Sequence, residues 1–507
     1  MRADFDIAVI GSGFAGSLMA MIARRLGRSV VLIERGRHPR FAIGESSTPL
    51  ANLLLEELAR AYDLPMLLSL CKWGPWQRTY PHIACGKKRG FTFLHHTAGR
   101  PFGGRGSELL VAASPHDGIA DTHWYRADFD AFLVAQAQAL GVEFLDETEA
   151  TLFSLDDGVR FAVTRGGERR ELHAHFLIDA SGPRGFMHRA LGLADRPFAH
   201  MPTTQSLFAH FENVARWDAL HAHRVAPPFP PDDAAMHHVF DGGWIWELRF
   251  NNGVTSAGVV ATDALAAELR LSEGSRSWER LLSRLPSVRE QFADAKATMP
   301  FIHLPRVVAC SSEIVGENWA LLPSAAGFID PLLSTGFPLT LLGVLRLAEA
   351  IGSSHPFDQL KCYRTQTFRE LETTAYLVAA LYANLRDFEV FSALTLLYFA
   401  AASYTESAHR LGRPHLARGF LLCDEPRFGA AFHSICEAAL DVAPNERTAL
   451  VQRIYALIEP FDVIGLSDRE RHPWYPCLAT DFLDSAHKLH ATHPEAEAAL
   501  ARAGFTG

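Results

Sequence analysis

The chain has 507 residues, 48% of them hydrophobic and 21% charged, and this length predicts two or three domains of ordinary globular composition. Its net charge of −9 is spread without long runs, which argues against a nucleic-acid partner. The seven cysteines are scattered and form no CxxC pair, so they indicate neither a disulfide framework nor a zinc site and favour a reducing cytoplasm. Because the first predicted strand begins a few residues after Met1, no signal peptide is expected.

The first predicted unit, residues 6–34, is a strand, a glycine turn, a helix and a second strand. An apolar run at 7–10 is followed by Gly11-Ser12-Gly13-Phe14-Ala15-Gly16, and the second β-branched run ends at Glu34. In such a turn the first glycine bends the chain, the second lets a pyrophosphate approach and the third packs helix on strand. The helix N-terminus offers N–H groups to phosphate, and the acid suits a ribose. The unit predicts a dinucleotide site without choosing between FAD and NAD; the alternative is a glycine-rich turn of another α/β protein.

The next elements continue an α/β pattern. A helix is predicted from Pro49 with Thr48 as its cap, and Phe91, Phe93 and His95 alternate as in a strand, whereas residues 71–90 have no clear assignment. Residues 123–140 are predicted to form a loop that enters a helix. Strands are predicted at 142–145, 151–157, 159–164 and 171–178, and the last of them leads into a glycine turn at 179–182.

A different pattern begins near residue 197 and predicts a second, antiparallel sheet. Its strands are expected at 203–211, 237–250 and 254–262, followed by a helix at 277–293 that breaks at Pro286. A strand at 319–322 runs into a turn at 330–336, and from residue 341 onward the pattern is helical. The apolar stretch 388–404 contains Glu389 and is too short for a membrane span, so a buried helix is expected.

Four separated patches together resemble the flavin-dependent halogenases, a family within the FAD monooxygenases, and in particular the branch that acts on phenols and pyrroles. They are the glycine turn, the segment HPRFAIGES at 38–46, the turn Asp179-Ala180-Ser181-Gly182, and GFIDPLLSTG at 327–336. The resemblance covers about residues 4–350. With the predicted elements it implies an α/β fold: a Rossmann-like FAD-binding domain at 1–196 and 300–350, an inserted antiparallel β-sheet layer facing the substrate at 197–299, and a helical region at 351–507 covering the substrate site.

The resemblance also implies cofactor and halide contacts. FAD would be bound by Gly11, Gly13, Phe14, Ala15, Gly16, Glu34, Gly44, Glu45, Ser46, Arg126, Asp179, Gly182, Asp330 and Gly336. Among these, residues 44–46 would form a loop that links the flavin site to the substrate site. The backbone N–H groups of Thr335 and Gly336 would bind chloride or bromide, because successive N–H groups entering a helix make an anion site.

Lys88, in the segment ACGKKRGF, matches the lysine that meets hypohalous acid (HOX) in this family. A buried lysine with a lowered pKa suits this role, because desolvation disfavours the charged amine. Three successive charges are more often solvated surface, which is the alternative interpretation. Lys87 is the competing candidate if the match slips by one residue.

Two departures from the family pattern bear on the chemistry. The tryptophan motif, which is associated with keeping substrate away from the flavin, keeps Trp244 and Trp246 at the predicted substrate cavity, but Leu248-Arg249 replaces its Ile-Pro pair. The two tryptophans have an equally good interpretation as core aromatics of one strand face. Leu333 stands where tryptophan halogenases carry a glutamate, which argues against a tryptophan-type substrate site.

The resemblance therefore implies an FAD-dependent halogenase of secondary metabolism that uses FADH2, O2 and chloride or bromide to make HOX. Lys88 would direct HOX to an electron-rich phenol or pyrrole, free or tethered to a carrier protein, and a separate flavin reductase would supply FADH2. The alternatives are an aromatic hydroxylase using NAD(P)H, favoured by the altered tryptophan motif, and a flavin-binding protein without halogenation. No metal is expected, because the histidine pairs 95–96 and 237–238 have no further ligand at suitable spacing.

Overall fold

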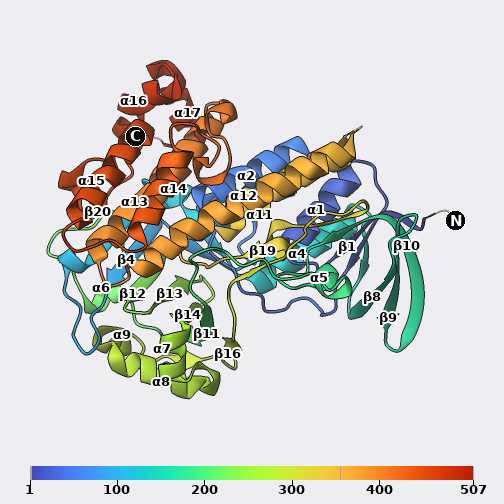
Figure 1. Cartoon of the computed structure of the whole chain (residues 1–507), viewed down its shortest axis with the longest axis horizontal. Helices are drawn as coiled ribbons and strands as arrows, with labels where there is room; N and C mark the ends of the chain where they lie inside the picture. The colour runs from blue at the N-terminus through green and yellow to red at the C-terminus, as the bar shows by residue number, and fades with distance from the viewer. Residues whose placement is uncertain (1–2, 354, 506–507) are drawn as a thin grey trace.

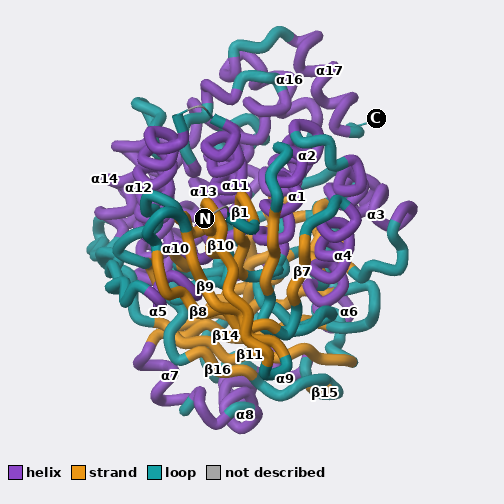
Figure 2. Tube along the Cα trace, turned by 90° about the vertical axis from the view of Figure 1, so that its right-hand side faces the viewer, coloured by secondary structure: helices purple, strands orange, loops and turns teal. Residues whose placement is uncertain are grey.

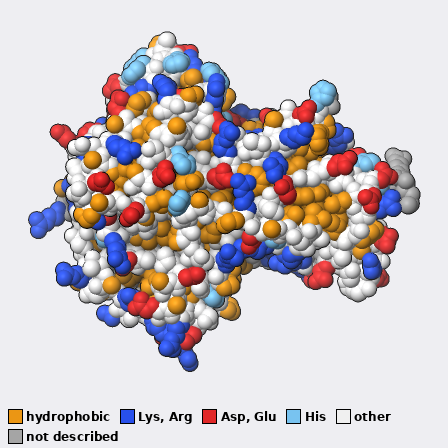
Figure 3. Space-filling model, viewed as in Figure 1, with side chains coloured by type: hydrophobic (Ala, Val, Ile, Leu, Met, Phe, Trp, Pro, Cys, Tyr) orange, Lys and Arg blue, Asp and Glu red, His pale blue; other side chains and the backbone are white. Residues whose placement is uncertain are grey.

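The computed structural model describes residues 3–353 and 355–505. Figure 1 shows a sheet-rich lobe at the right that carries the N-terminus, a second sheet with helices α7–α9 at the lower left, and the C-terminal helices at the upper left. The long helices α11 (Gly336–Gly352) and α12 (Pro356–Ala383) run between these parts. In Figure 2 the strands lie below a layer of helices. On the face in Figure 3, acidic and basic side chains are interspersed.

The first sheet is parallel around the glycine turn, and its strand order is β7-β2-β1-β10-β9-β8 with β18 beside β10. β1 (Phe5–Ile10) pairs in parallel with β2 (Val30–Ile33) and β10 (Glu168–Asp179), while β18 (Trp319–Leu321) and β7 (Glu143–Leu145) extend the parallel part. β8 (Thr148–Ser154) and β9 (Val159–Arg165) add an antiparallel hairpin. The carboxyl ends of β1, β2 and β10 meet at one edge, where ligands of such sheets bind.

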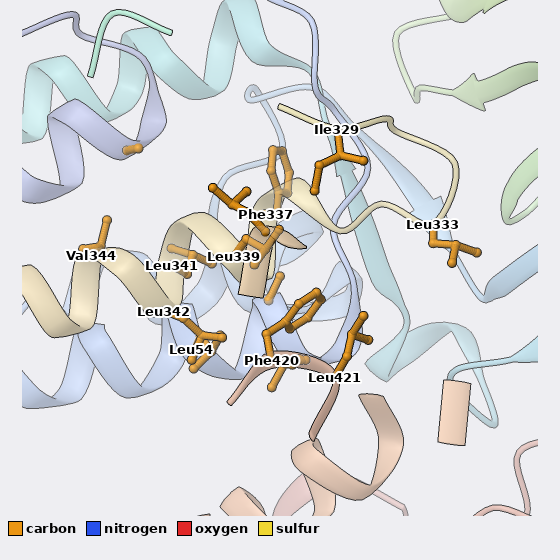
Figure 4. Close-up of a cluster of buried hydrophobic side chains, with 14 of the residues drawn as sticks. Leu54, Ile329, Leu333, Phe337, Leu339, Leu341, Leu342, Val344, Phe420 and Leu421 are labelled. Carbon is orange, nitrogen blue, oxygen red and sulfur yellow. The ribbon is translucent and has the colours of Figure 1, made fainter. Parts of the chain in front are cut away.

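Helices α1 (Phe14–Arg25), α2 (Pro49–Ala61), α4 (Arg126–Ala139) and α11 pack around this sheet edge. The predicted cap of α2 is present, because the Thr48 hydroxyl accepts the Ala51 N–H at 3.1 Å. Figure 4 shows Leu54 of α2 beside the apolar face of α11 and the Phe420–Leu421 segment. The N-terminal and C-terminal parts of the chain thus share one apolar core.

The second sheet has the order β15-β11-β14-β13-β12-β4-β5-β20, with β16 beside β11. Its strands are β4 (Gly90–His95), β5 (Glu108–Ala112), β11 (Thr204–Glu212), β12 (Ala235–Phe240), β13 (Gly243–Arg249), β14 (Thr255–Thr262), β15 (Lys296–Ala297), β16 (Ile302–Leu304) and β20 (Trp474–Tyr475). It was expected to be antiparallel, but β4 pairs with β12 and β20 with β5 in parallel. The sheet also takes strands from outside residues 197–299. The domain boundaries themselves stay predictions.

The remaining elements connect the sheets and cover them. The helices are α3 (Trp73–Thr79), α5 (Phe186–Ala190), α6 (Trp217–Leu220), α7 (Asp263–Leu269), α8 (Ser275–Arg284), α9 (Pro286–Gln291), α10 (Pro323–Ala326), α13 (Phe388–Arg410), α14 (Gly429–Ala439), α15 (Arg447–Ile458), α16 (Ala479–Ser485) and α17 (His493–Ala503). The short strands are β3 (Cys85–Lys88), β6 (Asp121–Trp124), β17 (Ala309–Cys310) and β19 (Gly327–Phe328). In the described part of the chain, α13 alone is long and apolar enough to cross a membrane, and 78% of its most apolar window is buried inside the protein, as expected of a core helix.

The structure corrects one predicted element, assigns a stretch that had no assignment, and confirms a predicted break. The single strand predicted at 237–250 is wrong, because Asp241 and Gly242 (φ +81°) turn the chain between β12 and β13. The unassigned stretch 71–90 contains α3 and β3, and β3 pairs with β6. The predicted break at Pro286 is confirmed, because α8 ends at Arg284 and α9 begins at Pro286.

Candidate active site

The glycine turn brings three backbone segments into contact. Gly11 has φ +98°, and a Cβ there would lie 2.7 Å from the Ala180 carbonyl oxygen. A Cβ on Gly16 would lie 1.9 Å from the Gly11 carbonyl oxygen, which no larger residue tolerates. Gly13 is the N-cap of α1 and provides no side-chain cap. The first N–H groups of α1 therefore face the turn with no capping side chain, as a pyrophosphate site requires.

Glu34 follows β2, and its side chain is 7% exposed beside the glycine turn. Its Oε2 accepts the Ser12 N–H at 3.1 Å, the Ser12 hydroxyl at 3.0 Å and an Arg40 N–H at 2.9 Å, and its Oε1 accepts the Gly36 N–H at 2.9 Å. Burial alone raises the pKa of Glu34, but Gly36, Arg40 and Ser12 together hold that pKa below its usual value. Glu34 is thus an ionised acceptor, and each of its carboxylate oxygens can accept more than one hydrogen bond.

Asp179 at the end of β10 accepts three hydrogen bonds from the turn that follows it. Its Oδ1 accepts the Ser181 N–H at 2.9 Å and the Ser181 hydroxyl at 2.5 Å, and its Oδ2 accepts the Met187 N–H at 2.7 Å. Burial raises the pKa of Asp179. Gly182 has φ +87° and no atom within 4 Å of an added Cβ, so this side of the turn is open.

Arg126 at the start of α4 holds the loop of residues 44–47, here named the strap loop. Its Nε and Nη2 each donate to one oxygen of Asp130 at 2.8 Å, and its Nη1 donates to the carbonyls of Ile43 at 3.1 Å and Gly44 at 2.8 Å. Gly44 has φ +90°, where glycine is favoured. The guanidinium therefore positions the strap loop.

The second residue of the strap loop is tied to the second sheet. Glu45 Oε1 lies 2.9 Å from Nε2 of His210 on β11, and both side chains are at least 90% buried. The Glu45 carbonyl accepts the Trp124 N–H at 2.6 Å. Its other carboxylate oxygen, Oε2, is buried and has no hydrogen-bond partner among the described residues. Sequence reasoning missed His210, which stands 165 residues from Glu45 and carries no local signal.

Lys88 ends β3 and is fully buried. Its Nζ donates to the Ser46 hydroxyl at 2.8 Å and to the Ser47 carbonyl at 2.6 Å, and lies 3.7 Å from the centroid of the Phe91 ring. Burial lowers the pKa of Lys88 to about 7, and the charge of Asp121 opposes this fall. Near neutral pH the amine is therefore present both with and without its proton, so it can donate a proton or act as a nucleophile.

The neighbouring Lys87 has a different environment. It points to the opposite face of β3, where Nζ lies 2.6 Å from Asp117 and 3.0 Å from Asp233. Partial burial alone lowers the pKa of Lys87, but these two carboxylates outweigh burial and raise that pKa. Of the two candidate lysines, Lys88 is the one that lies in the interior.

The turn before α11 holds a buried carboxyl group and an open helix N-terminus. Asp330 accepts the Tyr382 hydroxyl at 2.8 Å and the Leu332 N–H at 2.9 Å, and burial raises the pKa of Asp330 to about 7. Thr335, the N-cap of α11, makes no side-chain cap bond. A Cβ on Gly336 would meet no atom within 4 Å. The first amides of α11 thus face an open space that suits an anion.

The two tryptophans of the altered motif are both in the core. Trp244 Nε1 donates to the Tyr382 hydroxyl at 3.2 Å, so a chain of hydrogen bonds runs from β13 to Asp330. Trp246 Nε1 donates to the Ser256 hydroxyl at 3.2 Å. Arg249, at the altered position, bonds to Asp232 and to the carbonyls of residues 214 and 215, so it occupies a separate contact. Tyr382, which sequence reasoning missed, connects the motif to the turn.

A cavity of about 120 Å³ lies between the second sheet and the C-terminal helices. Phe91, whose ring carries the Lys88 amine on its face, forms part of the wall together with Val111. One face of α13 contributes Phe399 and a group of polar side chains further along. These polar residues are Ser403, Glu406, Ser407 and Arg410, and Lys72 joins them from the segment before α3. The C-terminal residues around Phe505 close the far side.

Within residues 3–353 and 355–505, no cluster of three or more His, Cys, Asp or Glu side chains could hold a metal ion. The predicted histidine pairs are instead engaged in protein contacts. His96 Nε2 lies 2.9 Å from His238 Nδ1, and His238 Nε2 lies 2.9 Å from Glu247. This network packs the interior of the second sheet.

Two family models match the chain. The tryptophan halogenase model matches residues 121–391, just over half of the chain, and the FAD binding domain model matches residues 6–222. The matched segments contain the glycine turn, the turn before α11 and most of the second sheet. The glycine turn thus lies within the FAD binding domain match, and the turn before α11 lies within the tryptophan halogenase match.

Individual relatives agree with the models. Monodechloroaminopyrrolnitrin halogenase PrnC of Pseudomonas fluorescens is 27% identical over 489 residues, covering 90% of this chain and 85% of its own length. Tetracycline 7-halogenase of Kitasatospora aureofaciens is 28% identical over 73% of this chain and 67% of its own. The crystal structure of halogenase PltM in complex with phloroglucinol and FAD superposes with a TM-score of 0.83 at 25% identity, over 93% of this chain and 99% of that one. The chain is therefore an FAD-dependent halogenase that belongs to the tryptophan halogenase family.

Proposed function

We propose that this enzyme halogenates a single-ring, electron-rich aromatic compound of the phenol or pyrrole type, with Lys88 as the residue that presents the halogen. The observation that carries the proposal is the amine itself. It is fully buried, its pKa is lowered by burial to about 7, and it lies on the face of the Phe91 ring, which forms part of the cavity wall. Two relatives support this substrate class. One is named as a chlorinase of a pyrrole-2-carbonyl group on a peptidyl-carrier protein, and the other, PltM, is described in complex with phloroglucinol.

The residues at the sheet edge fit FAD. The uncapped N-terminus of α1 would receive the pyrophosphate, Glu34 the ribose, and the strap loop would lie over the ring system. Arg126 has its donors engaged with Asp130 and the strap loop, and it would act by positioning that loop. FAD, bound as FADH2, supplies the two electrons that with O2 and a halide ion yield HOX.

The halide ion would bind at the N-terminus of α11. The amides of Thr335 and Gly336 begin a helix of 17 residues without a capping side chain, and the space above Gly336 is open. A helix N-terminus carries about half a positive charge, which favours a monovalent anion. In this proposal HOX would form beside this halide site and reach the substrate past Lys88.

Lys88 could activate HOX in either of its two protonation states. The ammonium form donates a proton to the departing hydroxyl group, so that water leaves as the ring carbon attacks the halogen. The neutral form instead takes the halogen from HOX, releases water, and passes the halogen to the ring. Ser46 and Ser47 hold the amine in place through hydrogen bonds of 2.8 and 2.6 Å. A dry surrounding confines the oxidant.

The cavity suits a small uncharged ring. Its volume of about 120 Å³ is close to the roughly 150 Å³ of an engineered protein cavity that binds benzene. Lys72 is paired with Asp121 at 3.0 Å and Arg410 with Glu406 at 2.8 Å, so the two cationic side chains are compensated. The remaining polar groups can bind a hydroxyl or pyrrole N–H.

The test is incubation of the purified protein with FADH2, O2 and bromide against phenols, pyrroles and indoles, with a pyrrole thioester on a carrier protein as a further arm. We expect bromination of phenols or pyrroles and a mass shift of one bromine. A companion assay with NAD(P)H and FAD alone should show no flavin reduction, because a separate reductase supplies FADH2. Hydroxylated product without halogenated product would overturn the proposal, as would full activity of Lys88→Ala.

A further inference from the structure

Aromatic halogenation requires a proton acceptor as well as a halogen donor. When the ring carbon attacks the halogen, the new carbon–halogen bond forms on a carbon that still bears hydrogen. The C–H bond must then break, its electron pair returns to the ring, and a base takes the proton. Lys88 acts on the leaving hydroxyl in the same event, so a second group is needed at the ring.

Two other positions are unsuitable for this base. The position on the turn before α11 is Leu333, which is buried and apolar. Asp121 lies opposite Lys88 in the β3–β6 pair, but it is fully buried, and its Oδ1 accepts from Asn52 at 2.8 Å and from Lys72 at 3.0 Å. Both of these hydrogen bonds are made inside the protein, and Asp121 does not line the cavity.

Glu406 is the one carboxylate among the described residues that line the cavity. It lies on α13 one turn before Arg410, whose Nε donates to Glu406 Oε1 at 2.8 Å. Arg410 thus fixes one oxygen, and no side chain of the described residues donates to Oε2. Ser403 and Ser407 lie on the same helix face and also line the cavity. The side chain of Glu406 is 19% exposed, which leaves a route for the proton to solvent.

We propose that Glu406 is a second catalytic residue, the base that accepts the ring proton after halogen transfer. This rests on the proposed function. The carbon–halogen bond forms as the oxygen–halogen bond breaks; Lys88 gives its proton to the hydroxyl group, which leaves as water. The C–H bond then breaks, and Glu406 Oε2 takes that proton. Return of one proton from Glu406 to Lys88 through solvent restores both groups, so the sum is ArH + HOX → ArX + H2O.

The test compares the intact enzyme with Glu406→Gln, using phenol and ring-deuterated phenol as probes with FADH2, O2 and bromide. We expect the intact enzyme to show little isotope effect, because in this proposal the formation of HOX, which breaks no C–H bond, limits the rate of bromination. In Glu406→Gln, bromination should fall about 10²-fold or more, and a primary isotope effect should appear because C–H cleavage becomes limiting. A purely structural role would slow both substrates equally. Glu406→Asp, a shorter carboxylate, should restore part of the rate.

The matched control is Glu57→Gln. Glu57 is a partly exposed carboxylate on α2 that contacts His409, the neighbour of Arg410 on α13. It lies outside the cavity lining, and its variant should keep the rate and isotope effect of the intact enzyme. Unchanged bromination in Glu406→Gln, or slowing without an isotope effect, would overturn the assignment of Glu406. If Glu406→Gln does not fold, the same isotope measurement is made on Glu406→Asp. A slower rate with an isotope effect then supports the assignment, and no isotope effect overturns it. A lack of any bromophenol from the intact enzyme would instead refute the proposed function for phenols.

Discussion

Replacement of Lys88 by methionine should stabilise the protein while abolishing halogenation. The amine is fully buried, and its pKa falls from 10.5 to about 7. At 1.36 kcal/mol per pKa unit, this fall corresponds to about 5 kcal/mol by which burial disfavours the charged form. Methionine has a similar length and no charge, so it removes this penalty. The buried amine therefore lowers the stability of the native protein, as groups retained for activity often do.

The sign and the pH window follow from proton binding. Between about pH 7 and 10.5 the unfolded chain keeps the lysine proton and the native protein does not, so stability of the native enzyme rises with pH. Below about pH 7 both states are protonated and the full penalty applies. Methionine abolishes this dependence. It also loses the hydrogen bonds to Ser46 and Ser47, worth about 1 kcal/mol each, which leaves a net gain of about 2–3 kcal/mol at pH 7.

Thermal melting of the native enzyme, Lys88→Met and the control Lys87→Met between pH 6.5 and 9.5 measures this effect. At pH 7 the Lys88→Met protein should melt about 2–3 °C higher, and the gap should narrow as pH rises. Lys87→Met loses only partly exposed ion pairs, worth about 0–1 kcal/mol, and should keep halogenation. A lower melting temperature for Lys88→Met at pH 7, or a gap that does not change with pH, would refute the reasoning.

Three further substitutions probe the cofactor and halide sites. Gly16→Ala forces a Cβ to within 1.9 Å of the Gly11 carbonyl, so it should cost about 1–3 kcal/mol and weaken FAD binding, as followed by flavin absorbance. In Gly336→Ala the added Cβ has no atom within 4 Å, so the melting temperature should not change. The methyl group would instead occupy part of the proposed halide site, so the KM for bromide should rise in steady-state assays. Tyr382→Phe leaves the buried Asp330 without its hydroxyl donor and should lower stability by about 1–3 kcal/mol, as measured by denaturant titration.

Local motifs were readable because their geometry is set by neighbours in sequence. The turn around Gly11 and Gly16 is dictated by backbone clearance, and a missing Cβ is visible in the residue letters. The buried α13 was also predictable, because its apolar run contains Glu389 and is too short to span a membrane. In contrast, the strand predicted at 237–250 was wrong because its apolar character masked the Asp-Gly dipeptide at 241–242, a strong hairpin signal.

The contacts that complete the site could not be predicted in this way. Glu45 and His210 are 165 residues apart, and Asp330 and Tyr382 are 52 apart, so neither pair has a sequence spacing that indicates contact. The alternation of β3 could not choose between Lys87 and Lys88 until the start of the strand was known. Glu406 is part of an ordinary helical i,i+4 pair, and only the cavity beside α13 distinguishes it from a surface pair.

The strap loop is held in place by three different elements. Its successive residues are fixed by different elements: the Gly44 carbonyl by Arg126 of α4, the Glu45 carboxylate by His210 of β11, and Ser46 by Lys88 of β3. Each contact involves a charged or buried group, and each hydrogen bond contributes about 1 kcal/mol or more. Displacing the loop would therefore break several of them together. The strap loop is thus a fixed part of the structure, and its residues Ser46 and Ser47 also orient the amine of Lys88.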